Sequence, residues 1–242
     1  MSEVVVPDTQ PIPRLLLLFA SRGGCEGELA EALPRLAGDI AGKCAHPLHA
    51  LGLVRQRPDP IAQGIGENRA FDAGLDLRLE AGGNVDALVD AAQGIGEQVA
   101  ALAHVDLSYA IAGPLHRIIE NRGGTIRYLY VMRRRADWKD AEYLAHYSKQ
   151  HVKFGLRTQG IRGYSTHRVD REASRRAARA TGLGAWAVSS VSELYIADVA
   201  EFFEKAMGSQ VGDEAIADEE RFVDRANSIA CVMDVVFDRQ LA

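Results

Sequence analysis

The pattern that decides the fold begins at Gly123-Gly-Thr-Ile126-Arg-Tyr-Leu-Tyr-Val-Met132. Its β-branched and aromatic residues follow a glycine pair, which predicts a strand over 126–132. Asp137 comes next and can cap a helix. Along that helix, apolar or aromatic positions recur at steps of three and four, at Leu144, Tyr147, His151 and Phe154. This spacing is typical of an amphipathic helix.

The rest of the second half completes a known order of elements. Glycines lead into a strand over 164–169, an arginine-rich excursion occupies 168–179, and a third strand is predicted over 188–196. A helix over 199–207 and a strand over 228–237 follow. The order β-α-β-β-α-β is the ferredoxin-like unit, an antiparallel sheet with both helices on one face.

The first half has the same order. Strands are predicted over 15–20, 49–55, 71–79 and 105–112, and helices over 26–41 and 85–102. In the strand over 71–79 apolar residues alternate with Asp72, Asp76 and Arg78, so one face is polar and is expected to meet water. The chain is therefore interpreted as α+β, with tandem units at 1–122 and 123–242.

Composition excludes several classes of protein. The 242 residues are 47% hydrophobic and 25% charged, as in an ordinary globular protein, and a net charge of −5 gives no reason to expect nucleic acid. No apolar run is long enough to span a membrane, and no signal peptide is evident, so we expect a cytoplasmic protein. Three cysteines without CxxC spacing indicate neither a disulfide framework nor a zinc site.

Four segments of the second half resemble the EthD family of dimeric α/β-barrel proteins. They are Tyr143-Leu-Ala-His146-Tyr147-Ser-Lys-Gln-His151, Gly160-Ile-Arg-Gly-Tyr164-Ser-Thr-His167, Val191-Ser-Glu193-Leu-Tyr195-Ile and Asp218-Glu-Glu-Arg-Phe222-Val-Asp224-Arg. The family helix has an aromatic residue, an aromatic pair and a histidine followed by Ala-Pro. Here Val152-Lys153 replaces Ala-Pro.

The resemblance implies a tandem protein with a diverged N-terminal copy. Its two sheets then pack face to face and form within one chain the barrel that single-copy relatives make by dimerising. Each sheet has helices on one face only, so the other face needs a partner. A ligand site is expected inside this barrel. Whether two-domain chains pair further as a homodimer stays open.

The third strand of the second half should direct Val191, Glu193 and Tyr195 into the barrel. A buried carboxylate needs a partner or a function. Glu193 is accordingly a candidate group to orient a histidine, or it forms an ion pair with an arginine across the sheet and only stabilises the barrel.

His151 is the candidate proton shuttle, because an imidazole titrates near neutral pH. His146 lies five residues earlier, roughly 140° away around a helix of about 100° per residue, so the two should not share a proton. Either histidine could instead be a core residue bonded to backbone.

Tyr164 and His167 lie three apart on one strand, so they point to opposite faces and only one can line a pocket. That one is the candidate oxyanion donor, although either could simply be a packing residue. The remaining candidates for substrate binding are Tyr147, Tyr195, His146, His49 and Arg78. His46 and His49 flank Pro47 and lack a third ligand, so no metal site is expected.

The family resemblance implies a cofactor-independent enzyme of the cyclase, isomerase, decarboxylase or lyase type, acting on a small aromatic or polyketide-like compound in aromatic degradation or secondary metabolism. No GxGxxG or GxSxG fingerprint is present. One alternative is a non-catalytic accessory protein that binds an aromatic ligand for an oxygenase system. A second is a haem protein with His151 as axial ligand. The arginine-rich segment is either a solvated surface helix or a lid that brings a cation to an acidic substrate.

Overall fold

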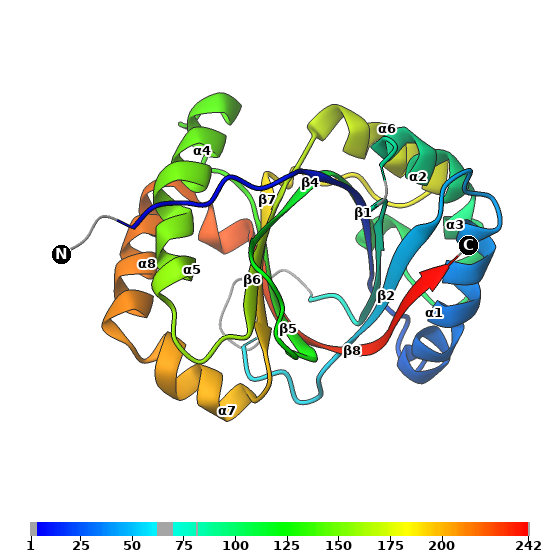
Figure 1. Ribbon diagram of the computed structural model, residues 1–242. Helices are drawn as coiled ribbons and strands as arrows, with labels where there is room; N and C mark the ends of the chain where they lie inside the picture. The colour runs from blue at the N-terminus through cyan, green and yellow to red at the C-terminus, as the bar shows by residue number, and fades with distance from the viewer. Residues whose placement is uncertain (1–3, 62–69, 81, 242) are drawn as a thin grey trace.

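The structure, a computed structural model, describes residues 4–61, 70–80 and 82–241. Its strands form one closed barrel in the order β1-β3-β2-β8-β5-β7-β6-β4, with helices packed around the outside (Figure 1). The predicted fold class is confirmed: two ferredoxin-like units share a single antiparallel barrel.

Each half supplies four consecutive positions of the barrel. The first half contains strands β1 (Ile12–Phe19), β2 (Leu48–Arg55), β3 (Ala73–Arg78) and β4 (Tyr109–Ile119), and helices α1 (Glu26–Ala41), α2 (Val85–Ala91) and α3 (Ile95–Val99). The second half contains β5 (Ile126–Met132), β6 (Gly163–Arg168), β7 (Ser190–Ile196) and β8 (Ile229–Leu241), and helices α4 (Asp140–His146), α5 (Val152–Arg157), α6 (Arg171–Thr181), α7 (Val199–Phe202) and α8 (Gln210–Phe222).

Two seams between the halves close the barrel. β2 pairs with β8, and β4 pairs with β6, both antiparallel. A sheet edge with unpaired backbone groups is a liability in water, and these seams pair the outer edges of both four-stranded sheets. The turn at 120–125, where the sequence predicts a domain boundary, lies between β4 and β5.

Alternation along the strands sends one set of side chains into the barrel and the other toward the helices. On β1, Leu15 and Leu17 pack against the helices of the first half, whereas Leu16 and Leu18 lie inside the barrel. Leu129 of β5 and Val191 of β7 join the inner set. This part of the interior is a dry aliphatic core.

The polar face of β3 also lies inside the barrel, so the expectation that it meets water is wrong. Asp76 is fully buried, and it is paired with Arg14 and Arg78. Burial penalises the ionised carboxylate, but the two arginines outweigh that penalty and hold the pKa of Asp76 well below its usual range. Ion pairing, rather than solvation, satisfies these charges.

Several helices differ from their predicted extents. The predicted helix over 85–102 is two helices, separated at Gly94, whose φ of 76° is left-handed. The helix predicted to start at Asp137 begins at Asp140, because Asp137 pairs with Arg135 and Glu142 accepts the backbone N–H of Lys139. Helix α8, over residues 210–222, is not among the elements predicted from the sequence.

The arginine-rich segment is the surface helix α6. Its Ala173 and Ala177 pack into the core of the first half, and Arg176 reaches Asp86 on α2 at 2.7 Å. Arg171 pairs with Asp140 at the start of α4. These partners lie outside the cavity described below, so the lid alternative has no support. Among the described residues no helix has the length and apolar character needed to cross a bilayer.

Candidate functional site

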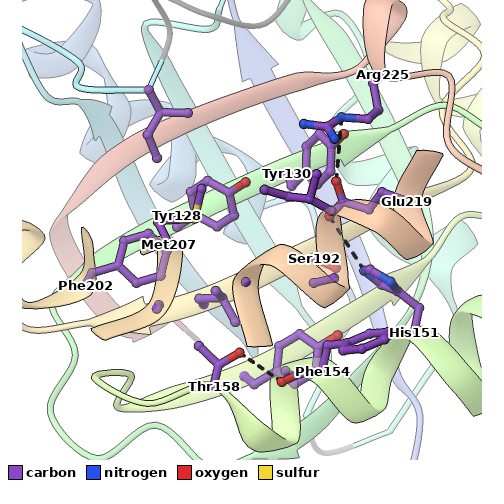
Figure 2. Close-up of a pocket in the computed structure, with 18 residues that line it drawn as sticks. Tyr128, Tyr130, His151, Phe154, Thr158, Ser192, Phe202, Met207, Glu219 and Arg225 are labelled. Atoms are coloured by element: carbon purple, nitrogen blue, oxygen red, sulfur yellow. Dashed lines mark hydrogen bonds and ion pairs between the residues drawn. The ribbon is translucent and has the colours of Figure 1, made fainter. Parts of the chain in front are cut away.

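A cavity of about 120 Å³ lies between the sheet and the helices of the second half, outside the barrel (Figure 2). Its floor is the outer face of β5, β6 and β7, with Tyr130, Tyr164 and Leu194. Its walls come from α5, α8 and the helical segment over 199–207. The lining is mostly apolar, with a few polar groups at one end, as is typical of small-molecule sites.

The expectation of a ligand chamber inside the barrel is therefore wrong. Four of the predicted site residues lie within the barrel instead of the cavity: Glu193, His167, Tyr195 and Arg78. The predicted inward direction of Glu193 and Tyr195 is correct. However, ion pairs fill one part of this interior and aliphatic side chains fill another.

Glu193 forms the ion pairs with arginine that the second of the two alternatives predicts. It is fully buried and pairs with Arg14 from the first half and with Arg127 at 3.1 Å from the second. The guanidinium carbon of Arg127 lies 3.8 Å from the centre of the Tyr195 ring. The Tyr195 hydroxyl is 3.0 Å from the Ser165 hydroxyl. These contacts connect the two halves across the barrel and leave Glu193 no route to a histidine in the cavity.

His167 is fully buried beside this cluster. Burial, and after it the nearby Arg14, lowers the pKa of His167 well below its usual range, so the imidazole is neutral. Tyr164, three residues earlier, faces the opposite way and lines the cavity, as its spacing predicts. Gly155 makes room for this ring, because a Cβ atom there would lie 2.3 Å from it.

His49 lies at the rim of the barrel, away from the cavity. Its ring nitrogens contact Glu80, at 2.8 Å, and Asp238. Glu80 belongs to the first half, and Asp238 lies on β8, which pairs with β2. His49 therefore belongs to a network of ion pairs at the rim of the barrel. Tyr147 is nearer the site: it is fully buried, stacks on His151 and lies 2.9 Å from the Ser192 hydroxyl.

His151 lines the cavity, on a π-helical turn at Tyr147–His151. Its Nδ1 lies 3.1 Å from Asp218 Oδ2, and its Nε2 lies 3.9 Å from Glu219 Oε1. His146 Nε2 lies 3.0 Å from the same Asp218 carboxylate. The two histidines thus share one partner, contrary to the expectation from α-helical geometry. A π-turn bonds i to i+5, which brings residues five apart onto nearly one face.

Glu219 is the acidic group of the cavity. Burial raises its pKa to about 7, and the nearby His151 and Arg225 only partly oppose this effect. Arg225 Nε lies 3.9 Å from Glu219 Oε2. Figure 2 shows Arg225, Glu219 and His151 in sequence along one end of the cavity. A carboxyl group that titrates near neutral pH is suited to proton transfer.

Tyr130 supplies the remaining polar group at that end. Its side chain is 4% exposed, and the side chains of Ser228 and Arg225 are hydrogen-bonding neighbours of its hydroxyl, although neither makes a well-aligned bond to it. Burial raises the pKa of Tyr130, so the phenol keeps its proton and can donate it in a hydrogen bond. A phenol that keeps its proton and lines a cavity can donate a hydrogen bond to a ligand oxygen.

Sequence reasoning missed Glu219, Tyr130 and Arg225. Glu219 lies in the segment Asp218-Glu-Glu-Arg-Phe222, for which the sequence analysis predicts no helix. In a helix over 210–222, Glu219 and Phe222 are three residues apart and lie on one face, so the apolar Phe222 would indicate that the carboxylate points inward. Among the described residues no group of three or more histidine, cysteine, aspartate or glutamate side chains could hold a metal ion.

This fold and site define a double ferredoxin-like barrel protein with a cavity under the helices of one half. Residues 135–226, in the second half of the chain, match the model of the EthD domain. That range includes His146, His151, Asp218, Glu219 and Arg225. No curated protein matches the sequence.

Solved structures share the whole architecture at low sequence identity. An anthrone oxidase-like protein aligns over 98% of this chain and 96% of its own, with a TM-score of 0.65 and 11% identity. A monooxygenase-like protein from Fusobacterium nucleatum subsp. nucleatum aligns over 97% and 96%, with a TM-score of 0.56 and 12% identity. A chlorite dismutase-like protein aligns over 94% and 96%, with a TM-score of 0.52 and 12% identity. These similarities establish the fold.

Proposed function

We propose that the cavity of the second half is the active site of a cofactor-independent enzyme that moves a proton on a small aromatic or polyketide-like compound. One observation carries the proposal: His151 Nε2 and Glu219 Oε1 lie 3.9 Å apart at the polar end of a mostly apolar cavity. Two proton-transfer groups at that separation can both reach one bound molecule.

The chemistry assigned to these groups is removal of a proton from a carbon that is next to a carbonyl or conjugated with it through an aromatic ring. His151 Nε2 takes the proton, and the C–H electron pair moves onto the carbonyl oxygen to form an enolate. The Tyr130 hydroxyl donates a hydrogen bond to that oxygen, and Arg225 supplies positive charge nearby. Return of the proton to another atom of the same molecule completes an isomerisation.

The names of the structural neighbours favour a different fate for the enolate. An anthrone oxidase-like and a monooxygenase-like protein share the fold, and an electron-rich enolate can transfer its electrons to dioxygen. In both cases the first step is the same deprotonation. We therefore propose an electron-rich phenolic ketone as the substrate class and deprotonation as the committed step.

The apolar end of the cavity suits one aromatic ring. Phe202, Met207 and Leu194 line it. A cavity of about 150 Å³ holds a benzene-sized molecule, and about 120 Å³ is close to that size, so we propose that a single ring occupies this end and the rest of a larger substrate extends toward the opening.

The residues around His151 do not fit a haem. The cavity of about 120 Å³ is well below the roughly 300–1,000 Å³ usual for ligand sites, and a macrocycle needs the larger end of that range. Both ring nitrogens of His151 also face carboxylates, Asp218 at 3.1 Å and Glu219 at 3.9 Å. We derive no step through iron.

Hydrogen–deuterium exchange tests the proposal without requiring the final product. Anthrone, a ketone whose enol tautomer is a phenol, is incubated with protein in deuterated buffer under argon, and loss of its methylene proton signal is followed by NMR. We expect exchange well above the buffer rate, and a loss of roughly 10²–10⁴-fold in His151→Gln. His46→Gln, an exposed histidine of the first half, is the matched control.

Two results would contradict the enzyme assignment. One is equal exchange by wild type and His151→Gln with both folded. The other is saturable binding of anthrone with no exchange above buffer, which would favour the accessory-protein alternative instead.

A further inference from the structure

The π-helical turn at Tyr147–His151 places two histidines on one carboxylate. Asp218 on α8 accepts from His151 Nδ1 at 3.1 Å and from His146 Nε2 at 3.0 Å. In a regular α-helix the two rings would point about 140° apart, and one carboxylate could not reach both. π-turns are uncommon and often lie at functional sites.

Asp218 is held in its ionised form. Burial acts to raise its pKa, but hydrogen bonds from His151 and His146 outweigh burial and keep the pKa below its usual range. Arg221, at 3.4 Å, adds positive charge from the solvent side. An ionised carboxylate only accepts hydrogen bonds, so each ring nitrogen facing it must carry a hydrogen.

This requirement fixes the tautomer of both rings. In neutral His151 the hydrogen is on Nδ1, which leaves the lone pair on Nε2, the nitrogen that faces Glu219 and the cavity. In neutral His146 the hydrogen is on Nε2. A carboxylate that orients an imidazole in this way sets which nitrogen can act as a base.

We infer that Asp218 is the positioning residue of the site: through the π-turn it holds the His151 ring with Nε2 unprotonated and directed into the cavity. His146 is the second donor that keeps the carboxylate in place. The inference deepens the proposed function and rests on it only for its effect on catalysis, because the tautomer itself is a property of the resting protein.

The packing around the pair supports a fixed ring orientation. The His151 ring stacks on Tyr147, with ring centres 6.0 Å apart. It also makes an edge contact with Phe222, with ring centres 5.2 Å apart. Phe222 also contacts His146, at 4.7 Å between ring centres. Since Asp218 and Phe222 are four residues apart on α8, a single helix face sets both the carboxylate and the aromatic contact.

Long-range ¹H–¹⁵N NMR of the histidine side chains tests this inference. Spectra of the wild type are recorded near pH 8, where free imidazoles are neutral, and rings are assigned with His151→Gln and His146→Gln. We expect an unprotonated Nε2 in His151 and an unprotonated Nδ1 in His146. A wild-type His151 ring with its hydrogen on Nε2 would overturn the inference. This measurement uses the wild-type protein, so it does not depend on whether an Asp218 variant folds.

Asp218→Asn, whose side-chain amide can donate to Nδ1, should move the His151 hydrogen to Nε2. Asp213→Asn, an exposed residue of the same helix, is the matched control and should leave both rings unchanged. Unchanged tautomers in a folded Asp218→Asn would also overturn the inference. Anthrone exchange should fall about 10²-fold or more in Asp218→Asn. If the tautomers behave as expected but wild type shows no exchange, the proposed function fails while the positioning role stands.

Discussion

The two halves of the barrel have the same topology but fill the space beneath their helices differently. In the first half α1 packs on β2 and β3 and places Leu29, Leu33 and Leu36 in one buried cluster with Leu48 and Leu75, so the layer is a leucine-rich core. In the second half the corresponding layer contains stacked aromatic rings, His151 and a buried carboxyl group around a cavity.

Small residues and irregular helices account for this difference. Gly155, Ala206 and Gly212 line the cavity, whereas leucine side chains are frequent in the buried cluster of the first half. Two π-helical turns, at Tyr147–His151 and Phe203–Met207, interrupt the helical layer of the second half. We therefore expect the first half to contribute mainly stability and the second half to contain the ligand site. The predictions below test that division.

The ion cluster that joins the halves should show the largest effect on stability. Glu193→Ala leaves Arg14 and Arg127 without their shared carboxylate in a fully buried setting. We expect a loss of about 3–5 kcal/mol in the free energy of unfolding, measured by urea denaturation. Glu204→Ala, an exposed glutamate of the second half, is the control. A loss below about 1 kcal/mol would mean that the cluster does not hold the halves together.

Truncation of the first-half core should lower stability without affecting the site. Leu33 is fully buried on α1, so Leu33→Ala is expected to cost about 2–5 kcal/mol in urea denaturation. The rate of anthrone exchange per folded molecule should stay that of the wild type. A selective loss of exchange in the folded variant would show that the first half shapes the cavity.

Glu219 should make the second half sensitive to pH. Its pKa in the folded protein is about 7 against 4.5 for the free group, so the folded state binds more protons between these values. Its contribution to stability is complete below about pH 4.5 and is lost as the pH rises through 7. Glu219→Gln cannot ionise and escapes this loss.

The stability of Glu219→Gln relative to wild type should consequently increase by up to about 3 kcal/mol between pH 5 and pH 8. Urea denaturation at both pH values measures the difference. Glu220→Gln, its exposed neighbour, should show no such trend. A flat difference for Glu219→Gln would indicate a solvated carboxylate.

Filling the cavity should have the smallest effect on stability and a clear effect on binding. Ala215 of α8 lines the cavity, and Ala215→Leu places additional methyl groups in the space for the ligand. We expect a stability change within about 1.5 kcal/mol, together with loss of anthrone binding by fluorescence titration. Ala217→Leu, on the exposed face of the same helix, should keep binding. Normal binding by Ala215→Leu would place the ligand elsewhere.

Strand positions could be predicted from the sequence because a period of two is a local property. The strand over 126–132, the inward direction of Glu193 and the opposite faces of Tyr164 and His167 all follow from alternation. The closed barrel follows from two sheets that each have one uncovered face.

The location of the site did not follow, because both faces of each sheet are buried. Alternation assigns Glu193 and Tyr164 to different faces, but it does not say which face leaves a cavity. The π-turn could not be predicted from the sequence either. In an α-helix the spacing of His146 and His151 separates the two side chains by about 140°. The π-helical turn at Tyr147–His151 brings both to Asp218. The burial of Glu219 depends on the packing of α8 against α5 and the π-helical turn at Phe203–Met207, which is a tertiary property.

Closure of the barrel within a single polypeptide has a consequence for how such a molecule can diverge. In a dimer of identical subunits every substitution occurs twice, so a residue that opens a pocket under one set of helices also weakens the other. The seams β2–β8 and β4–β6 join two non-identical sheets, and each mutation is felt once. Covalent linkage thus allows one half to change independently of the other.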